Sequence, residues 1–401
     1  MAPIGVGIIG LSSTAKTSWA SGAHLPYLLS PRGKAKYAVV ALCNSTPQAA
    51  RAAVTAYSLP PSTKTYGDPE SLAADPDVQL VVVCTRADVH RDTAMPSVKA
   101  GKDVFVEWPL AQDVARAREL AEEARRAGGR TVVGMQGRLA PVLVKMRQVL
   151  AGEGRIGKVL SSEVRASGGS DDRETLASGL GYFARREVGG NIFTIGHGHL
   201  FDQVQYVLGD FTHIQSRLQL QRPDIKLRDP ATGEITSTVR SDVPDLVFFT
   251  AGLSPSPSSS TTSSSSSSTG SVPIAPGASV LVRHRRGQPF PGQPALEWTI
   301  NGEKGELRLI SQNSTTIHAA AYASGPVRLE LHDHATGAVE EVPWEWAGWQ
   351  EELGYAARSI GAVYEEFAKG EGVGVYAGFG DALRRHEQLE GMLDAWAASS
   401  L

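Results

Sequence analysis

Two short stretches of the chain carry residue types that can do chemistry. Glu107-Trp108-Pro109 ends an apolar run, 103–106, and His199 lies within a predicted helix over 189–208. An imidazole exchanges a proton near neutral pH, so His199 is a candidate for proton transfer. The alternative is a structural histidine that hydrogen-bonds to Asp202 or to the backbone. Trp108 offers one indole N–H and no charge, so it can flank a bound cofactor or fill a core.

The pair of imidazoles in His197-Gly198-His199 also raises the question of a metal ion. No third cluster of ligand residues accompanies the pair in the sequence, so we predict no metal site. Cys43 and Cys84, the two cysteines, each end an apolar run. This pattern favours free, buried thiols in a reducing compartment over a disulfide framework.

Apolar runs in the first third of the chain alternate with helical patterns. Between two of these runs, 111–127 is rich in Ala, Leu, Arg and Glu at helical spacing. Strands that alternate with helices predict an α/β fold with a doubly wound parallel sheet of the Rossmann type, which binds ligands at the carboxyl ends of its strands. The predicted buried strands are 3–11, 37–43, 78–84, 103–106 and 131–136.

The residues that follow these strands are candidates for contact with a dinucleotide. Only Gly10 remains of the three glycines usual after the first strand, but Ser12, Ser13 and Thr14 add hydroxyl groups where a helix would begin. The later strands are followed by the other candidates: Cys84, Thr85, Arg86 and His90, then Glu107, Trp108 and Pro109, then Gln136 and Arg138.

The residues after the second strand bear on the choice of cofactor. An NAD site usually offers an acid here to the ribose hydroxyls, and an acid would repel a 2′-phosphate. This chain offers neutral or positive groups instead, and no Asp or Glu precedes Asp68. We therefore predict NADP as the cofactor, with NAD as the less favoured alternative. The residues concerned are Asn44, Ser45, Thr46 and Arg51.

The pattern changes from Lys158 onward, where strands begin to follow one another without helices between them. This predicts a second, C-terminal α+β domain with an open, largely antiparallel sheet, and thus domains at 1–145 and 146–401. The serine-rich segment 254–271 cannot bury apolar surface, so we expect a disordered loop there. The strands predicted in this domain are 159–166, 246–253, 279–285, 296–301 and 306–310.

Length and composition limit the possible classes of function. A chain of 401 residues exceeds one ordinary core and fits two domains. A net charge of -3 gives no support for binding nucleic acid or an anionic membrane. No run of about 18 apolar residues and no signal peptide is found, so we expect a cytoplasmic protein, with the nucleus also possible.

Six motifs in order resemble the glucose–fructose oxidoreductase and inositol dehydrogenase family. The resemblance implies a Rossmann domain followed by an open sheet domain that often pairs subunits, and therefore a homodimer. It also implies a small-molecule substrate. The motifs are the opening strand and turn, 104–111, Gly137-Arg138-x-x-Pro141, Gly154-x-Ile156-Gly157, Gly189-Gly190 and His199-x-x-Asp202.

The departures from the family pattern leave two functions open. Active members of the family typically have Glu-Lys-Pro where this chain has Trp108, and an Asp where this chain has Ile195. The first hypothesis is an NADP-dependent oxidoreductase that transfers a hydride to or from a carbonyl, hydroxyl or imine carbon of a small polar substrate. His199 would then move the proton, and Tyr182 or a water would replace the lysine. The second hypothesis follows from a resemblance to the branch that includes the fungal galactose-pathway repressor. It is a catalytically silent, NADP-binding transcriptional regulator with a protein partner.

Overall fold

The computed structural model describes residues 2–12, 14, 18–168, 172–254, 271–323, 325–370 and 372–399. Ser13 and most of the serine-rich segment, 255–270, lie outside the described residues. The chain forms two compact units that are not contiguous in sequence. Unit 1 comprises Met1–Gln136, Glu187–Gly190 and Ala347–Glu387, and unit 2 comprises Gly137–Arg186, Asn191–Trp346 and Gln388–Leu401. This division differs from the two contiguous segments expected from the sequence, because 347–387 returns to the first unit.

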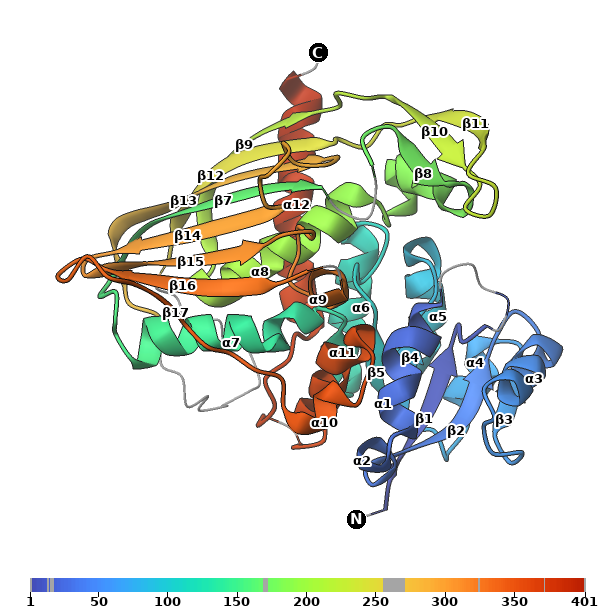
Figure 1. Cartoon of the computed structure of the whole chain (residues 1–401). Coiled ribbons are helices and arrows are strands. Elements are labelled where there is room, and N and C mark those ends of the chain that lie inside the picture. The colour runs from blue at the N-terminus through green and yellow to red at the C-terminus, as the bar shows by residue number, and fades with distance from the viewer. Residues whose placement is uncertain are drawn as a thin grey trace. The chain divides into compact units, whose positions relative to one another are not determined.

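Unit 1 is built on a six-stranded parallel sheet in the order β3-β2-β1-β4-β5-β6 (Figure 1). The central strands are rich in Val, Ile and Leu and are buried, as expected for a sheet covered on both faces. The predicted Rossmann-type sheet is confirmed. Its strands are β1 (Ile4–Ile9), β2 (Tyr37–Cys43), β3 (Lys64–Tyr66), β4 (Leu80–Val83), β5 (Asp103–Val106) and β6 (Thr131–Val133).

Four helices of unit 1, α2, α3, α4 and α6, begin at a residue whose side chain caps the helix. Thr46 accepts a hydrogen bond from the backbone of Ala49 at the start of α3, and Asp113 does the same for Arg116 at the start of α6. The helices are α1 (Leu25–Leu29), α2 (Pro31–Lys34), α3 (Pro47–Ala56), α4 (Pro69–Ala73), α5 (His90–Lys99), α6 (Val114–Ala127), α10 (Gly348–Glu351) and α11 (Tyr355–Phe367), with the first part of α12 (Phe379–Ser399).

Aromatic packing explains why α11 belongs to unit 1. The ring of Tyr364 stacks on that of Tyr27 with the centroids 5.4 Å apart, and the Tyr37 hydroxyl donates to the Tyr364 carbonyl. Arg130 lies over the ring of Phe367 at 3.7 Å. These contacts tie a late segment of the chain to the first helices and strands.

Unit 2 contains an eight-stranded mixed sheet in the order β17-β16-β15-β14-β7-β13-β12-β9. Only β7 and β13 pair in parallel, so the predicted, largely antiparallel sheet is confirmed. A three-stranded sheet, β11-β10-β8, accompanies it. The strands are β7 (Val159–Gly168), β8 (Thr175–Ala177), β9 (Phe211–Gln219), β10 (Asp224–Arg228), β11 (Ile235–Arg240), β12 (Leu246–Leu253), β13 (Ile274–Arg286), β14 (Leu296–Gly302), β15 (Gly305–Ser311), β16 (Val327–Asp333) and β17 (Val339–Glu341).

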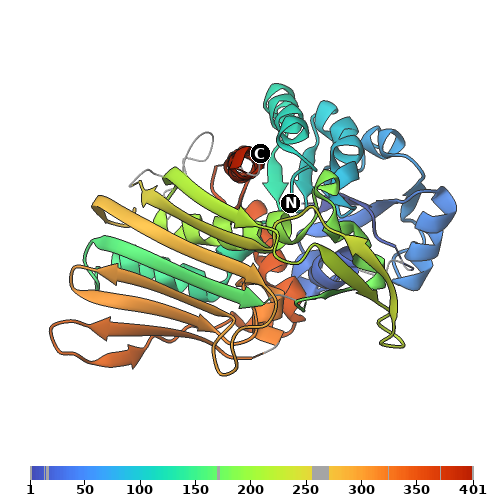
Figure 2. The ribbon, with the colours of Figure 1, turned by 90° about the horizontal axis from the view of Figure 1, so that it is seen from above.

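Helices α7 (Pro141–Arg147) and α8 (Gly198–Leu208) lie along one face of the large sheet, as Figures 1 and 2 show. Phe201 of α8 packs edge-to-face against Phe249 in β12 and Phe211 in β9. A short helix, α9 (Ala319–Ala323), and the last part of α12, from Gln388, also belong to the unit. Among the described residues, no helix is long and apolar enough to span a membrane.

The predicted helix over 189–208 is wrong at its start. Gly189 has a left-handed backbone, with φ of 75°, and its absent Cβ would lie 2.3 Å from the Cα of Gln112. The side chain of Asn191 then accepts hydrogen bonds from the backbone of Phe193 and Thr194. This cap starts a π-helical turn, Ile192–His197, that runs into α8.

Candidate functional site

The turn after β1 brings two strand ends into close contact. Gly10 has φ of 97°, and a Cβ on it would lie 2.7 Å from the carbonyl oxygen of Cys84, so only glycine fits. Beyond the glycine, the backbone N–H of Thr14 donates to the hydroxyl of Ser12 at 3.2 Å, and Tyr57 donates to the Ser12 carbonyl. Small, hydroxyl-bearing residues therefore occupy the turn where a phosphate group would approach.

The residues after β2 form a neutral to positive edge. The Asn44 amide donates to the carbonyl of Leu11 at 2.9 Å, which joins this edge to the turn after β1. Ser45 is exposed, Thr46 caps α3, and Arg51 is exposed and donates to the hydroxyl of Thr65. The sequence from Asn44 to Arg51 contains no acid.

The loop after β4 is organised by His90, which begins α5. Its ring nitrogens lie 2.8 Å from the carbonyl oxygen of Pro109 and 2.9 Å from that of Thr85. Burial lowers the pKa of His90, while the two carbonyl acceptors oppose that shift because they favour a ring protonated on both nitrogens. Arg86 forms a two-point ion pair with Asp88. The ring of His90 therefore links the backbone of the loop at Thr85 to the backbone at Pro109.

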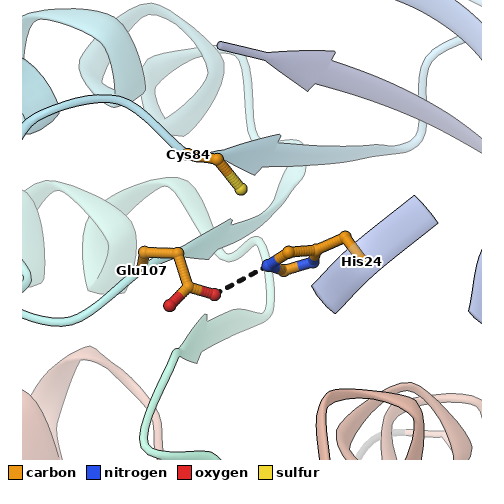
Figure 3. A group of neighbouring side chains, drawn as sticks. All are labelled: His24, Cys84 and Glu107. Atoms are coloured by element: carbon orange, nitrogen blue, oxygen red, sulfur yellow. Dashed lines mark hydrogen bonds and ion pairs between the residues drawn. The ribbon is translucent and has the colours of Figure 1, made fainter. Parts of the chain in front are cut away.

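Glu107, which follows β5, lies at the centre of a polar cluster. Its carboxylate is 2.7 Å from Nε2 of His24, whose Nδ1 is 2.8 Å from the hydroxyl of Tyr364. Figure 3 shows the thiol of Cys84 and the side chains of His24 and Glu107 directed toward the same space. Burial, and then the charge of Glu107, raises the pKa of Cys84 well above its usual value. An isolated thiol in this position is unreactive.

Trp108 is held inside unit 1. Its side chain is only 5% exposed, and its ring lies 4.8 Å from that of His386 in α12. The following peptide bond, to Pro109, is cis. Burial lowers the pKa of His386 to about 4, so the indole packs against a neutral imidazole. Gln136, the last residue of the predicted cofactor set in unit 1, is also buried.

Arg138, in unit 2, is committed to a buried ion pair. Its Nε and Nη2 donate to the two carboxylate oxygens of Asp202 at 2.9 and 2.6 Å. The side chains of Arg138 and Asp202 are only 9% and 2% exposed. The sequence proposed Arg138 for cofactor contact, with a structural role as the alternative, and in the structure its guanidinium pairs with Asp202 of α8.

His199 is buried on α8, and its ring lies 5.1 Å from that of His318. Burial, and then the neighbouring His318, lowers the pKa of His199 to about 3 against an opposing effect of Asp202. The imidazole is therefore neutral at physiological pH, in the form that accepts a proton.

Tyr182, the other residue proposed for catalysis, lies on a turn at the small sheet. Its ring packs edge-to-face on that of Phe183, and it is half-buried. Phe183 in turn packs on the apolar cluster formed by Leu176, Ala184, Ile225 and Leu227.

The sequence reasoning missed several residues that the structure brings to these places. His24, Tyr364 and His386 complete the surroundings of Glu107 and Trp108, and His318 lies beside His199. Each lies far in sequence from its partner, and no local motif marks any of them. Only an analysis of correlated positions among relatives carries a signal for such contacts.

Comparison with known proteins now places the chain. Residues 4–135 match an oxidoreductase family with an NAD-binding Rossmann fold, and residues 141–311 match the family of the Gal80p C-terminal domain. The dehydrogenase aclE of Aspergillus oryzae is 32% identical over 317 residues, which cover 79% of each chain. The chain belongs to this oxidoreductase family. It combines the Rossmann domain of the glucose–fructose oxidoreductase and inositol dehydrogenase family with a Gal80-like C-terminal domain, as the sequence motifs predicted.

Other members of the family include regulators as well as enzymes. The galactose/lactose metabolism regulatory protein GAL80 of Saccharomyces cerevisiae is 25% identical over 321 residues, which cover 77% of this chain and 67% of that protein. A super-repressor mutant of Gal80p from the same yeast shares the fold with a TM-score of 0.82 at 21% identity, over 100% of this chain and 97% of that one. Levoglucosan dehydrogenase in complex with NADH and L-sorbose also shares it, with a TM-score of 0.71 at 17% identity and coverage of 99% and 98%.

Proposed function

We propose that this chain is an NADP-dependent oxidoreductase that transfers a hydride to or from a carbonyl, hydroxyl or imine carbon of a small polar substrate. The observation that carries the proposal is the close approach at Gly10, where a Cβ would collide with the Cys84 carbonyl at 2.7 Å. This turn lies at the carboxyl ends of β1 and β4, where sheets of this class bind nucleotides. The 32% identity to a protein named a dehydrogenase supports the same reading.

Residues of unit 1 fit a dinucleotide. Backbone N–H groups and hydroxyls at Ser12 and Thr14 would bind phosphate, and Asn44, Thr46 and Arg51 would surround the adenosine ribose. Bound, the nicotinamide would supply or accept the hydride. His199 would accept the substrate proton during oxidation and return it during reduction, because an imidazole nitrogen can both bind and release a proton.

The first test is oxidation of NADPH by the purified protein with a panel of aldoses, ketones, aldehydes and imines. We expect turnover, and we expect His199→Ala to lower it at least ~100-fold, the range of a general acid–base step. The affinity for NADPH should stay the same, because the cofactor-binding candidates with the clearest support lie in unit 1. Exposed His334 in unit 2 provides a matched control as His334→Ala. Equal turnover in His199→Ala and the native protein would remove His199 from the mechanism.

A second candidate function is a cofactor-loaded transcriptional regulator that binds a protein partner. The observation that favours it is Trp108, which replaces the lysine typical of active members and is buried against His386. The match of 141–311 to the Gal80p C-terminal domain agrees with it. Tight NADPH binding without turnover of any substrate in the panel would favour this function over the enzyme.

Cofactor choice can be tested separately, at Arg51. We expect Arg51→Ala to weaken NADPH binding about tenfold and NADH binding little, because only NADPH has a 2′-phosphate to pair with the guanidinium. Arg91→Ala is the control, since Arg91 is a partly exposed arginine of unit 1 that pairs with Asp92 and Glu119. Calorimetry with both cofactors measures the difference. Equal weakening for NADPH and NADH would contradict the proposed specificity.

We also propose that two copies of the chain pair through the open face of the large sheet in unit 2. Phe248 of β12 and Leu281 of β13 support this, because they are 37% and 42% exposed on adjoining strands. Light scattering in solution gives the mass that decides between monomer and dimer.

A further inference from the structure

The polar cluster around Glu107 contains three side chains of metal-binding type. His24 ends a π-helical turn, Ala20–His24, while Cys84 and Glu107 directly follow β4 and β5. Val83 and Val106 are paired in the parallel sheet, so the next residue of each strand occupies an equivalent position. The sheet register therefore directs the thiol and the carboxylate to the same side, where the imidazole meets them (Figure 3).

We propose that His24, Cys84 and Glu107 form a binding site for a divalent cation of the zinc class. One ligand atom from each side chain lies within 4.8 Å of the other two, and Nε2 of His24 is 2.7 Å from Oε1 of Glu107. Ligand atoms around one tetrahedral zinc ion lie about 3.4 Å apart, given zinc–ligand bonds of about 2.0–2.3 Å. The three side chains would reach that geometry by shifts of roughly 1 Å.

The combination of ligands selects the kind of ion. A thiolate and an imidazole favour zinc over magnesium or calcium, which prefer oxygen ligands. Three protein ligands leave one tetrahedral position for water or another small ligand. No step of the proposed hydride transfer depends on this site, although two of its residues, Cys84 and Glu107, are also candidates for contact with the dinucleotide.

The residues around His24 and Glu107 accommodate these two ligands both with and without a bound metal ion. Tyr364 places its hydroxyl 2.8 Å from Nδ1 of His24. A tyrosine hydroxyl can donate or accept, so it can serve either tautomer of the ring. When Nε2 binds a metal, Nδ1 carries the proton and donates a hydrogen bond to the hydroxyl of Tyr364. A hydrogen bond from the second ring nitrogen is usual for metal-bound histidine. The Glu107 carboxylate has room because Gly134 lies beside it, where a Cβ would come within 2.3 Å of Oε2.

Binding of a metal ion changes the protonation state of Cys84. Cys84 is a protonated thiol in the metal-free protein, because burial raises its pKa. A metal ion reverses this effect and deprotonates a coordinating thiol. Each ion bound should thus release one proton from Cys84, and affinity should fall as the pH is lowered.

Titration of the chelator-treated full chain with Co²⁺ and Zn²⁺ tests the site without any activity assay. We expect one Co²⁺ to bind with a thiolate-to-metal absorption band, and Zn²⁺ to displace it, while Mg²⁺ does not. Cys84→Ser should abolish the band and weaken Zn²⁺ binding at least ~100-fold. Cys43→Ser is the matched control, since Cys43 is the other free cysteine of the chain and is the last residue of β2, away from the cluster; it should keep the band.

A second variant shows whether weaker binding results from the loss of a ligand or from misfolding. Glu107→Gln retains a side chain that can hydrogen-bond to His24 but lacks the carboxylate, so it should fold and bind Zn²⁺ more weakly. Thermal melting of each variant without metal confirms that it is folded. Absence of stoichiometric binding to the native chain, or an unchanged band in Cys84→Ser, would overturn the site. NADPH binding is measured separately, so that failure here leaves the proposed function standing.

Discussion

Replacing Asp202 with alanine should destabilise the folded protein by about 3–5 kcal/mol, the usual effect of breaking a buried ion pair from one side. The guanidinium of Arg138 donates to both carboxylate oxygens, and both side chains are almost fully buried in unit 2. In the variant, Arg138 would keep its buried charge without its carboxylate. Unfolding by urea, followed by tryptophan fluorescence, measures the loss.

Two further variants separate the charge effect from loss of packing. The double replacement Arg138→Met with Asp202→Leu removes both charges and should regain most of the lost stability, since apolar pairs of similar volume replace buried ion pairs well. Asp224→Ala, which breaks an exposed pair with Arg240 in the same unit, should change stability by less than about 0.5 kcal/mol. A double variant as unstable as Asp202→Ala alone would show that the ion pair is not the cause.

The protein should lose stability steeply as the pH falls below about 6.5. Besides His90, burial lowers the pKa of four further histidines, to about 3 in one, about 4 in two and well below the usual value in the other. Between those values and 6.5 the unfolded chain binds protons that the folded chain does not, so stability is complete above 6.5 and falls toward the folded-state pKa. Each such histidine contributes a slope of about 1.4 kcal/mol per pH unit. They are His199, His284, His386 and His197.

His197 offers the sharpest test of this pH dependence. Its ring lies among Phe193, Phe201 and Phe249 and 5.5 Å from the ring of His284. Neither of its ring nitrogens has a hydrogen-bond partner among the described residues. His197→Phe should therefore stabilise the protein by about 1–3 kcal/mol, because it removes an unsatisfied buried polar group.

The gain from His197→Phe should increase between pH 7.5 and pH 5. Urea midpoints at the two pH values measure it. The control is His334→Gln, an exposed histidine of the same unit, which should shift neither midpoint. A gain that is equal at both pH values would show that His197 does not contribute to acid sensitivity.

The sequence predicts the parts of this fold that rest on local pattern. Continuous apolar runs between helical segments predicted β1, β2, β4, β5 and β6 of the parallel sheet. Strands with mixed or exposed faces carry no such run. β11 was missed because almost all of its residues are exposed, and β9 was missed because it mixes exposed, half-buried and buried residues. The helix containing His199 was extended too far, because Asn191 caps it after a turn that requires glycine at residue 189.

The candidate site, too, was predictable only where it depends on local sequence pattern. The candidates that follow β1, β2, β4 and β5 lie at the carboxyl ends of parallel strands, a position that follows from the strand order, and their contact with a cofactor stays a prediction. Their partners were not predictable, because His24 and Tyr364 reach Glu107 from segments 83 residues before it and 257 residues after it. The pairing of Arg138 with Asp202 likewise depends on how α8 packs within unit 2.

The return of 347–387 to unit 1 has a consequence for protein synthesis. A ribosome delivers the chain from its N-terminus, so the parallel sheet emerges long before α11 exists. Until Tyr364 emerges, the rings of Tyr27 and Tyr37 lack the aromatic neighbour that packs on both of them in the finished protein. The nascent first unit therefore carries an unfilled apolar surface while all of the second unit's strands are being made, a period in which a chaperone would have a binding site.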